Sequence, residues 1–77
     1  MKYSYLYILR IDGMRCGSCE AHVNDLIRRN FSIVKVKSSH LFKKTKIYSN
    51  VELDTDKIKT FIENEGYVIK DILKEVH

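Results

Sequence analysis

The chain has 77 residues, of which 44% are hydrophobic and 31% are charged, and its formal net charge is +4 at pH 7. This length suits one small domain of modest stability, expected over residues 1–77. The only cysteines lie three positions apart and cannot join distant parts of a fold, which excludes a disulfide-rich secreted scaffold and predicts a reducing, cytoplasmic location. No signal-peptide core and no apolar run of about 18 residues is present, so we expect a soluble chain without membrane insertion.

The first half of the chain predicts a strand followed by a helix. Residues 3–11 alternate as a strand does, and the expected core face carries Tyr3, Tyr5, Tyr7, Leu9 and Ile11. Residues 18–29 follow with helical periodicity, and their apolar stripe consists of Cys19, Val23, Leu26 and Ile27. Ser18 is the expected N-cap of this helix, and Asn30 is expected to close it.

Two strands joined by a hairpin are expected next. Residues 32–38 predict a strand with Val34 and Val36 facing the core, while Lys35 and Lys37 face outward. Residues 45–51 predict a second strand centred on Ile47. The link between them is short enough for a hairpin, although it lacks an Asn-Gly or Asp-Gly turn.

A second helix and a last strand complete the pattern. Asp54 is the expected N-cap of a helix over residues 55–65, whose buried stripe is Ile58, Phe61 and Ile62. Gly66 stands where a left-handed residue commonly ends a helix. Residues 67–73 predict the last strand, and residues 74–77 are expected to fray.

The order strand–helix–strand–strand–helix–strand predicts an α+β fold with two helices on one face of a four-stranded antiparallel sheet. Right-handed crossovers leave few alternatives to this arrangement. It brings the cysteine loop, the hairpin and the turn at Gly66 and Tyr67 to the same end of the molecule.

The cysteines lie at the turn between the first strand and the first helix, in the stretch Gly13-Met14-Arg15-Cys16-Gly17-Ser18-Cys19. A Cys-x-x-Cys pair alone is ambiguous, because redox enzymes, zinc sites and disulfides all use it. At the start of a helix, exposed amide groups and the positive end of the helix dipole favour the thiolate form. Two adjacent soft anions suit a soft cation, first Cu(I) and then Zn(II).

The same residues resemble the heavy-metal-associated domain family, which includes copper chaperones, mercury-binding proteins and N-terminal modules of metal-pumping P-type ATPases. The resemblance is carried by Gly13-Met14-x-Cys16-x-x-Cys19, and it extends along the chain through Val23, Ile27, Phe31, Val34, Val36, Ile47, Ile62, Gly66 and Tyr67. Two departures are Arg15, where the family usually has Thr, Ser, His or Asp, and Phe31-Ser32, where it often has Gly-Val.

This resemblance implies a ferredoxin-like βαββαβ fold with Cu(I) held by Cys16 and Cys19. Zn(II), Cd(II) and Hg(II) stay open, because two thiolates accept all of them. The implied function is metallochaperone-like: a soft metal ion is held between two thiolates and passed to a partner by ligand exchange. Cys16, the more exposed thiol by its place in the loop, is expected to engage the partner first. The sequence does not distinguish a free-standing chaperone from a module of a longer transporter.

Four further residues lie where they could influence the site. Tyr67 is either a shield over the metal loop or a core residue that opens the last strand, and the two roles are compatible. Met14 is expected to turn inward as an anchor rather than to bind metal. His22 lies off the apolar stripe and is expected in solvent. The sequence does not show whether His40 influences the metal site.

Other function classes are weaker. A dithiol–disulfide oxidoreductase is the main alternative, but the chain has no proline, whereas the thioredoxin and glutaredoxin families place a cis-proline against their cysteines. An inert interaction module is a third reading, and nothing else indicates an enzyme. The positive charge is spread along the chain without a recognition motif, so we expect no nucleic-acid partner. Lys43, Lys44 and Lys46, with Arg15, form either a merely solvated hairpin or a docking surface for an acidic metal-binding domain of a P-type ATPase or similar transporter. The metal-free protein is expected to be a monomer.

Overall fold

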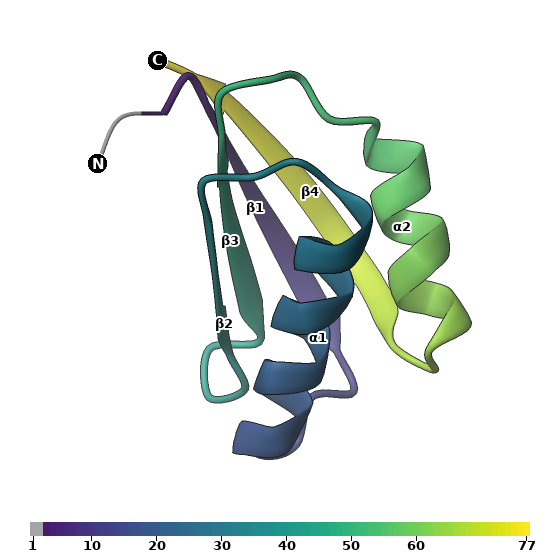
Figure 1. Cartoon of the computed structure of the whole chain (residues 1–77). Coiled ribbons are helices and arrows are strands. Elements are labelled where there is room, and N and C mark those ends of the chain that lie inside the picture. Colours follow the sequence, from purple (N-terminus) through teal and green to yellow (C-terminus); the bar gives the residue numbers. More distant parts are fainter. Residues whose placement is uncertain (1–2) are drawn as a thin grey trace.

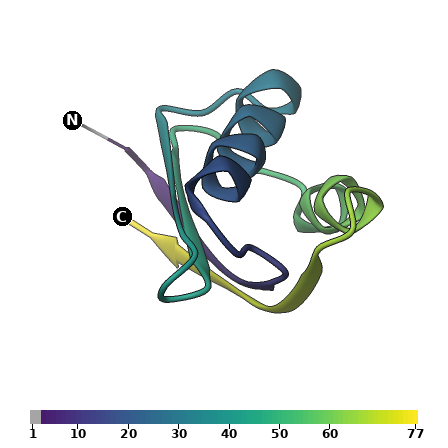
Figure 2. The same ribbon diagram turned by 90° about the horizontal axis from the view of Figure 1, so that it is seen from below.

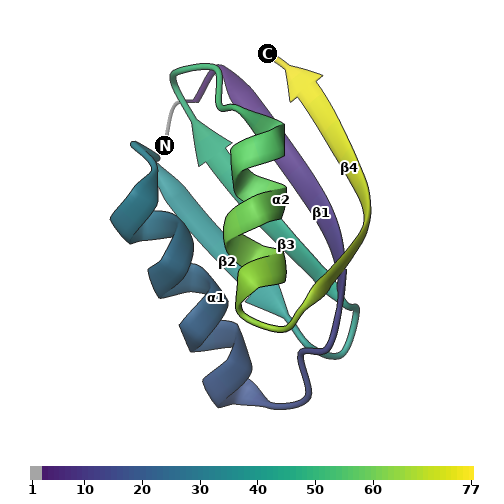
Figure 3. The ribbon, with the colours of Figure 1, turned by 90° about the vertical axis from the view of Figure 1, so that its right-hand side faces the viewer.

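A computed structural model describes residues 3–77 of the chain. Its elements in chain order are β1 (Tyr5–Asp12), α1 (Gly17–Asn30), β2 (Lys35–Ser39), β3 (Lys44–Ser49), α2 (Thr55–Asn64) and β4 (Val68–Val76) (Figure 1). The strands form one antiparallel sheet in the order β2-β3-β1-β4. Both helices cover the same face of this sheet, which leaves the other face without a helix (Figures 2 and 3). The predicted ferredoxin-like βαββαβ fold is confirmed.

The core lies between the sheet and the helices. Strand β1 contributes its alternate residues Tyr7, Leu9 and Ile11, each at most 1% exposed, and the helices and β3 contribute Val23, Ile27, Ile58, Ile62 and Ile47. The hydroxyl of Tyr7 is satisfied in this core, because it accepts a hydrogen bond of 2.9 Å from the amide N–H of Leu53. Central strand β1 is therefore held by burial on its inner face along the whole length that leads to the cysteine loop.

One end of the molecule collects the cysteine loop, the β2–β3 hairpin and the turn before β4 (Figure 1). The amide N–H of Ile11 donates a hydrogen bond of 2.8 Å to the carbonyl of Lys43 in the hairpin. The arrangement that the topology predicts is thus present. No helix in the described part of the chain is both long and apolar enough to cross a membrane.

Helix α2 begins as predicted and ends one residue before the predicted end, at Asn64. The carboxylate of Asp54 accepts hydrogen bonds from the amide N–H groups of Asp56 and Lys57, at 3.0 and 3.3 Å. Gly66 follows the helix with a φ of +94°, a conformation that favours glycine. Ile58 and Ile62 are fully buried. Phe61 is only partly buried, and it packs edge-on against Phe31 at the end of α1.

The expected fraying of residues 74–77 is wrong. Strand β4 continues to Val76, which is paired with Tyr5 of β1, and the amide N–H of His77 donates to the carbonyl of Ser4 at 2.7 Å. Lys74 adds an ion pair with Glu52. Pairing with β1 holds this end in the sheet although its side chains are mostly exposed.

One expectation about buried side chains also fails, and another holds in part. Val34 is 41% exposed rather than in the core, because the chain bends there and β2 begins only at Lys35. Val36 is buried and Lys35 and Lys37 are exposed, as predicted. Tyr3 and Tyr5 are only half-buried near the end of the sheet, although Tyr5 packs against the core as predicted.

Candidate metal centre

The cysteine loop is shaped by the two residues that follow β1. Gly13 has a φ of +111°, and a Cβ atom at this position would lie 3.1 Å from Cδ1 of Tyr67. Glycine is therefore required both for the backbone conformation and for the close approach of Tyr67. Met14 is 5% exposed and belongs to the core, so the prediction of an inward anchor is confirmed. These two residues fix where the chain leaves the sheet and enters α1.

Cys16 and Cys19 lie together at the start of α1. Both are free thiols, and their Sγ atoms are 3.7 Å apart. Two sulfurs bound to one ion at the usual Zn–S length are at most about 4.6 Å apart, so one ion can reach both. Cys16 is exposed and Cys19 is partly buried against the core, which matches the predicted difference between them.

Neighbouring polar groups favour the thiolate form of Cys16. The hydroxyl of Ser18 lies 2.9 Å from Sγ of Cys16 and is the largest cause that lowers the pKa of this thiol to about 7. The amide and thiol of Cys19 and the amide of Ser18 add to the shift. Cys16 makes no side-chain capping hydrogen bond, and its place at the positive end of α1 also favours the thiolate. With a pKa of about 7, a substantial fraction of the Cys16 thiol is ionised at neutral pH.

Tyr67 covers the inner side of the loop. Its ring is partly buried and contacts the position of Gly13, and burial is the main cause that raises the pKa of its hydroxyl, followed by the charge of Cys19. The hydroxyl therefore stays protonated beside the cysteines. The predicted core role of Tyr67 is confirmed, because it packs against the core. It also lies next to the loop, and its role as a shield over the metal stays a prediction.

Known structures with the same fold identify the architecture. The chain superposes on the yeast copper transporter domain CCC2A, solved in apo and Cu(I)-loaded states, with a TM-score of 0.79 and 27% identity over 91% of this chain and 96% of that one. The N-terminal domain of ZntA in its Zn(II) form gives a TM-score of 0.78 with 18% identity over 88% and 92%. The CopZ metallochaperone gives 0.74 with 22% identity over 83% and 97%. The chain has the heavy-metal-associated domain fold. No family profile matches the sequence, and no curated sequence is detectably similar to it.

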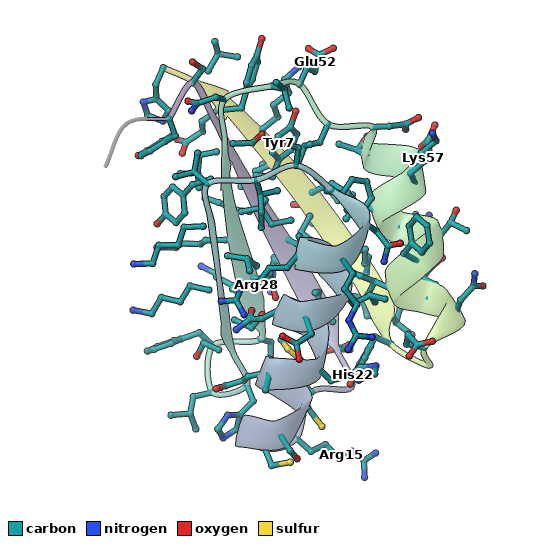
Figure 4. All side chains as sticks on the ribbon, in the orientation of Figure 1. Tyr7, Arg15, His22, Arg28, Glu52 and Lys57 are labelled. Atoms are coloured by element: carbon teal, nitrogen blue, oxygen red, sulfur yellow. The ribbon has the colours of Figure 1, made fainter. Side chains whose placement is uncertain are left out.

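Two of the three histidines, His22 and His40, are paired with carboxylates rather than with the cysteines. Nε2 of His22 lies 2.7 Å from Glu65, and Figure 4 shows His22 on the side of α1 that faces α2. Nδ1 of His40 lies 2.5 Å from Glu20. Within residues 3–77, no group of three or more His, Cys, Asp or Glu side chains is arranged to hold a metal ion. The candidate centre is therefore a two-thiol site, and His22 is exposed as predicted.

Positive charge lies beside the loop on two elements. Arg15 extends into solvent at the cysteine end of the molecule (Figure 4). Nζ of Lys43 lies 3.8 Å from Asp12, which also lies 3.8 Å from Nζ of Lys70. Lys44 and Lys46 are exposed on β3. The hairpin thus brings part of the predicted basic cluster to this end, although Asp12 offsets the charge of Lys43.

Sequence patterns missed two contacts of the site. The sequence predicts Ser18 as the N-cap of α1, but the N-cap lies two residues earlier, at Cys16, whose carbonyl accepts the first hydrogen bonds, from Cys19 and Glu20. Ser18 contacts the Cys16 sulfur instead. The other contact joins Glu20 to the hairpin: its carboxylate accepts from the amide N–H of His40 at 2.6 Å, and this bond is the main cause that lowers the pKa of Glu20. Neither contact has a local sequence signal.

Proposed function

We propose that this single domain is a metallochaperone-like module that binds Cu(I) between the thiolates of Cys16 and Cys19 and passes it to a partner protein. The observation that carries the proposal is the pair of thiols 3.7 Å apart at an uncapped helix terminus, with the pKa of Cys16 lowered to about 7. Cu(I) prefers such soft thiolate ligands. The structural likeness to a Cu(I)-loaded transporter domain and to a metallochaperone supports the same function.

Transfer follows from the low number of ligands. Two thiolates leave Cu(I) room for a third, so a partner cysteine that has lost its proton can bind before one of this domain's thiolates leaves. Cys16 is exposed and should contact the partner first, whereas Cys19 is partly buried beside Tyr67. The ion thus moves through three-coordinate intermediates without being released. Free thiols are required throughout, so we also propose a reducing, cytoplasmic location.

The choice of metal needs a direct competition. Zn(II), Cd(II) and Hg(II) also bind thiolates, and the ZntA domain of the same fold was solved with Zn(II). The reduced protein would be offered equal concentrations of Cu(I) and each other ion without oxygen, and the bound metal read by native mass spectrometry. We expect one Cu(I) per chain in the competition with Zn(II). Retention of Zn(II) against equimolar Cu(I) would overturn the copper assignment.

The proposed partner is the acidic metal-binding domain of a P-type ATPase or a similar transporter. Lys43, Lys44 and Arg15 lie near the cysteines and can steer the encounter with an acidic surface. The double change Lys43→Glu/Lys44→Glu should slow copper transfer to such a domain at low salt and leave Cu(I) affinity unchanged. Lys57→Glu/Lys59→Glu on α2 makes the same change of charge elsewhere. Equal transfer rates for both variants would remove the hairpin from the docking surface.

A dithiol oxidoreductase is the second candidate, and the lowered pKa of Cys16 favours it. The chain has no proline, so the cis-proline that such enzymes place against their cysteines has no counterpart. We expect only background reduction of insulin or hydroxyethyl disulfide in the presence of a thiol reductant. Turnover that depends on Cys16 would favour the redox function over the metal function.

A further inference from the structure

The tip of the β2–β3 hairpin exposes two adjacent large apolar side chains. Leu41 is 78% exposed and Phe42 is 76% exposed, the highest values among the large hydrophobic residues of the described chain. Single exposed apolar residues are ordinary, but an adjacent pair on a protruding turn marks a contact surface. The metal site does not use either residue.

The turn that carries this pair is held in place on both sides. His40, on one side, donates its amide N–H to Glu20 of α1 at 2.6 Å. Lys43, on the other, accepts from the amide N–H of Ile11 at 2.8 Å. Within the turn, the amide N–H of Phe42 donates to the hydroxyl of Ser39 at 3.3 Å. The apolar pair is therefore presented by a fixed turn and not by a loose loop, which lowers the entropic cost of a contact.

Behind the tip, lysines gather on the helix-free face of the sheet. The exposed positions of β2 and β3 carry Lys35, Lys37, Lys44 and Lys46. Nitrogen-tipped side chains accordingly project from this side of the sheet, away from the helices (Figure 4). None of these four lysines makes an ion pair with another residue in the range 3–77; the lysines that do are Lys43, Lys70 and Lys74.

These lysines act against the stability of the sheet. Lys37 lies directly opposite Lys46 in the register, and like charges in this position are destabilising. Lysine on an edge strand can prevent association with other sheets, which would explain Lys35 and Lys37 on β2. It does not explain Lys44 and Lys46, because β3 is an inner strand. The charge on β3 thus points to an anionic surface outside the molecule.

The apolar pair at the hairpin tip lies next to the lysines of the sheet. Phe42 borders a shallow hollow of about 380 Å³ on this face, whose other lining includes Lys37, Lys44, Lys46 and Tyr48. An anionic lipid bilayer uses both features, since it admits apolar side chains below the headgroups while the amines stay at the level of the phosphates. A nucleic acid would use the lysines and leave Leu41 in water. A protein would need a pocket shaped for the convex tip.

We propose that the hairpin tip of Leu41 and Phe42, with Lys37, Lys44 and Lys46 behind it, docks this domain reversibly on anionic membrane surfaces. The tip lies at the cysteine end, so docking brings the candidate metal centre to the bilayer (Figure 1). The contact needs no metal and no partner protein. It therefore stands or falls independently of the proposed copper transfer.

Binding to vesicles by the reduced, metal-free protein tests this surface. The chain has no tryptophan, so Phe42→Trp supplies a single reporter at the tip. Its emission should shift to the blue with vesicles of phosphatidylcholine containing about 30% phosphatidylserine at about 0.1 M salt, and should not shift with phosphatidylcholine alone. Brominated lipids should quench it, which reports insertion of the side chain. An unchanged spectrum with anionic vesicles would overturn the proposal.

Co-sedimentation of the variants separates the two contributions. Leu41→Ser/Phe42→Ser and Lys37→Glu/Lys46→Glu should each lower the partition coefficient about tenfold or more. Val51→Ser, half exposed in the connection before α2, and Lys57→Glu/Lys59→Glu on α2 are the matched controls and should bind as the parent does. Loss of binding with the lysine variant alone, together with competition by a single-stranded oligonucleotide, would mean a general polyanion surface and contradict membrane docking.

Discussion

The two helices begin in different ways, although each follows a connection from a strand. At α2, Asp54 is the N-cap and its carboxylate accepts hydrogen bonds from two amide groups of the first turn. At α1, the N-cap is Cys16, which has an extended backbone with φ −159° and ψ 177° and makes no side-chain capping bond. Asp and Ser are preferred N-caps, and cysteine is not among them. The N-terminus of α2 is therefore stabilised by a side-chain cap, and the N-terminus of α1 is not.

This difference separates the functional end from the rest of the fold. A carboxylate cap at α1 would occupy the amide groups whose dipoles favour the Cys16 thiolate. The absence of the cap leaves this terminus less stable and leaves its positive potential available to the thiols. Proteins commonly depart from the local rules of stability at functional sites, and here the departure is a single residue.

The largest expected effect comes from removing either thiol. Cys16→Ser and Cys19→Ser should each reduce Cu(I) affinity by several orders of magnitude, because one thiolate cannot hold the ion that two share. Cys16 is exposed and serine is a good N-cap, so Cys16→Ser should fold at least as stably as the parent. Cys19 packs against the core, and Cys19→Ser should be somewhat less stable. Chelator competition and thermal unfolding measure these effects, and near-parent affinity in Cys16→Ser would exclude the two-thiolate site.

The loop before α1 gives the next effect. Gly13→Ala would place a side chain at a φ of +111° and 3.1 Å from the Tyr67 ring, so we expect a loss of about 1–3 kcal/mol in the free energy of unfolding. Gly17→Ala is the matched control, since nothing lies within 4 Å of its Cβ position. It should be neutral or stabilising by up to about 1 kcal/mol. Equal losses in denaturant unfolding would show that the turn at Gly13 does not constrain the loop.

The sequence was sufficient for the six elements and their order because most have a clear periodicity. The sequence was not sufficient for the end of β4, because the side chains there are exposed and do not alternate between buried and solvated positions. Lys74 and Val76 are kept in the strand by their pairing with β1, which is a property of the sheet and not of the segment. The prediction that Val34 faces the core was wrong for a different reason. The alternation in the sequence extends across the bend at Val34, and β2 begins only after this bend.

The cysteine pair could be predicted because its residue types and spacing are local. The contacts that adjust the pair depend on atoms that the fold brings together. Glu20 meets His40 only because the hairpin returns to the start of α1. The contact between Ser18 and Cys16 is close in sequence, but it depends on a two-residue shift of the N-cap, and propensities do not fix helix ends so finely.

Removing the cap of α2 and adding a cap to α1 should change the free energy of unfolding in opposite directions. Asp54→Ala removes the two capping bonds of α2 and should cost about 1 kcal/mol, whereas Cys16→Asp adds a cap to α1 and should gain about 0.5–1 kcal/mol while abolishing metal binding. Urea unfolding of both variants measures the difference. A destabilised Cys16→Asp protein would mean that the geometry of the cysteine loop, and not the choice of residue, prevents capping.

The smallest effect concerns Ser18 and pH. The folded-state pKa of Cys16 is lowered to about 7, below the value of about 8.5 expected in the unfolded chain, so the thiolate stabilises the fold. This contribution is fully present above the unfolded pKa and is lost as the pH falls through the folded one, between about pH 8.5 and 7. Ser18→Ala removes the largest cause and should raise the pKa and weaken this pH dependence. Alkylation rates against pH, compared in a Cys19→Ser background that leaves one thiol, measure the shift, with Ser32→Ala as the remote control. Identical profiles for Ser18→Ala and Ser32→Ala would leave the helix dipole, and not the Ser18 hydroxyl, as the group that ionises Cys16.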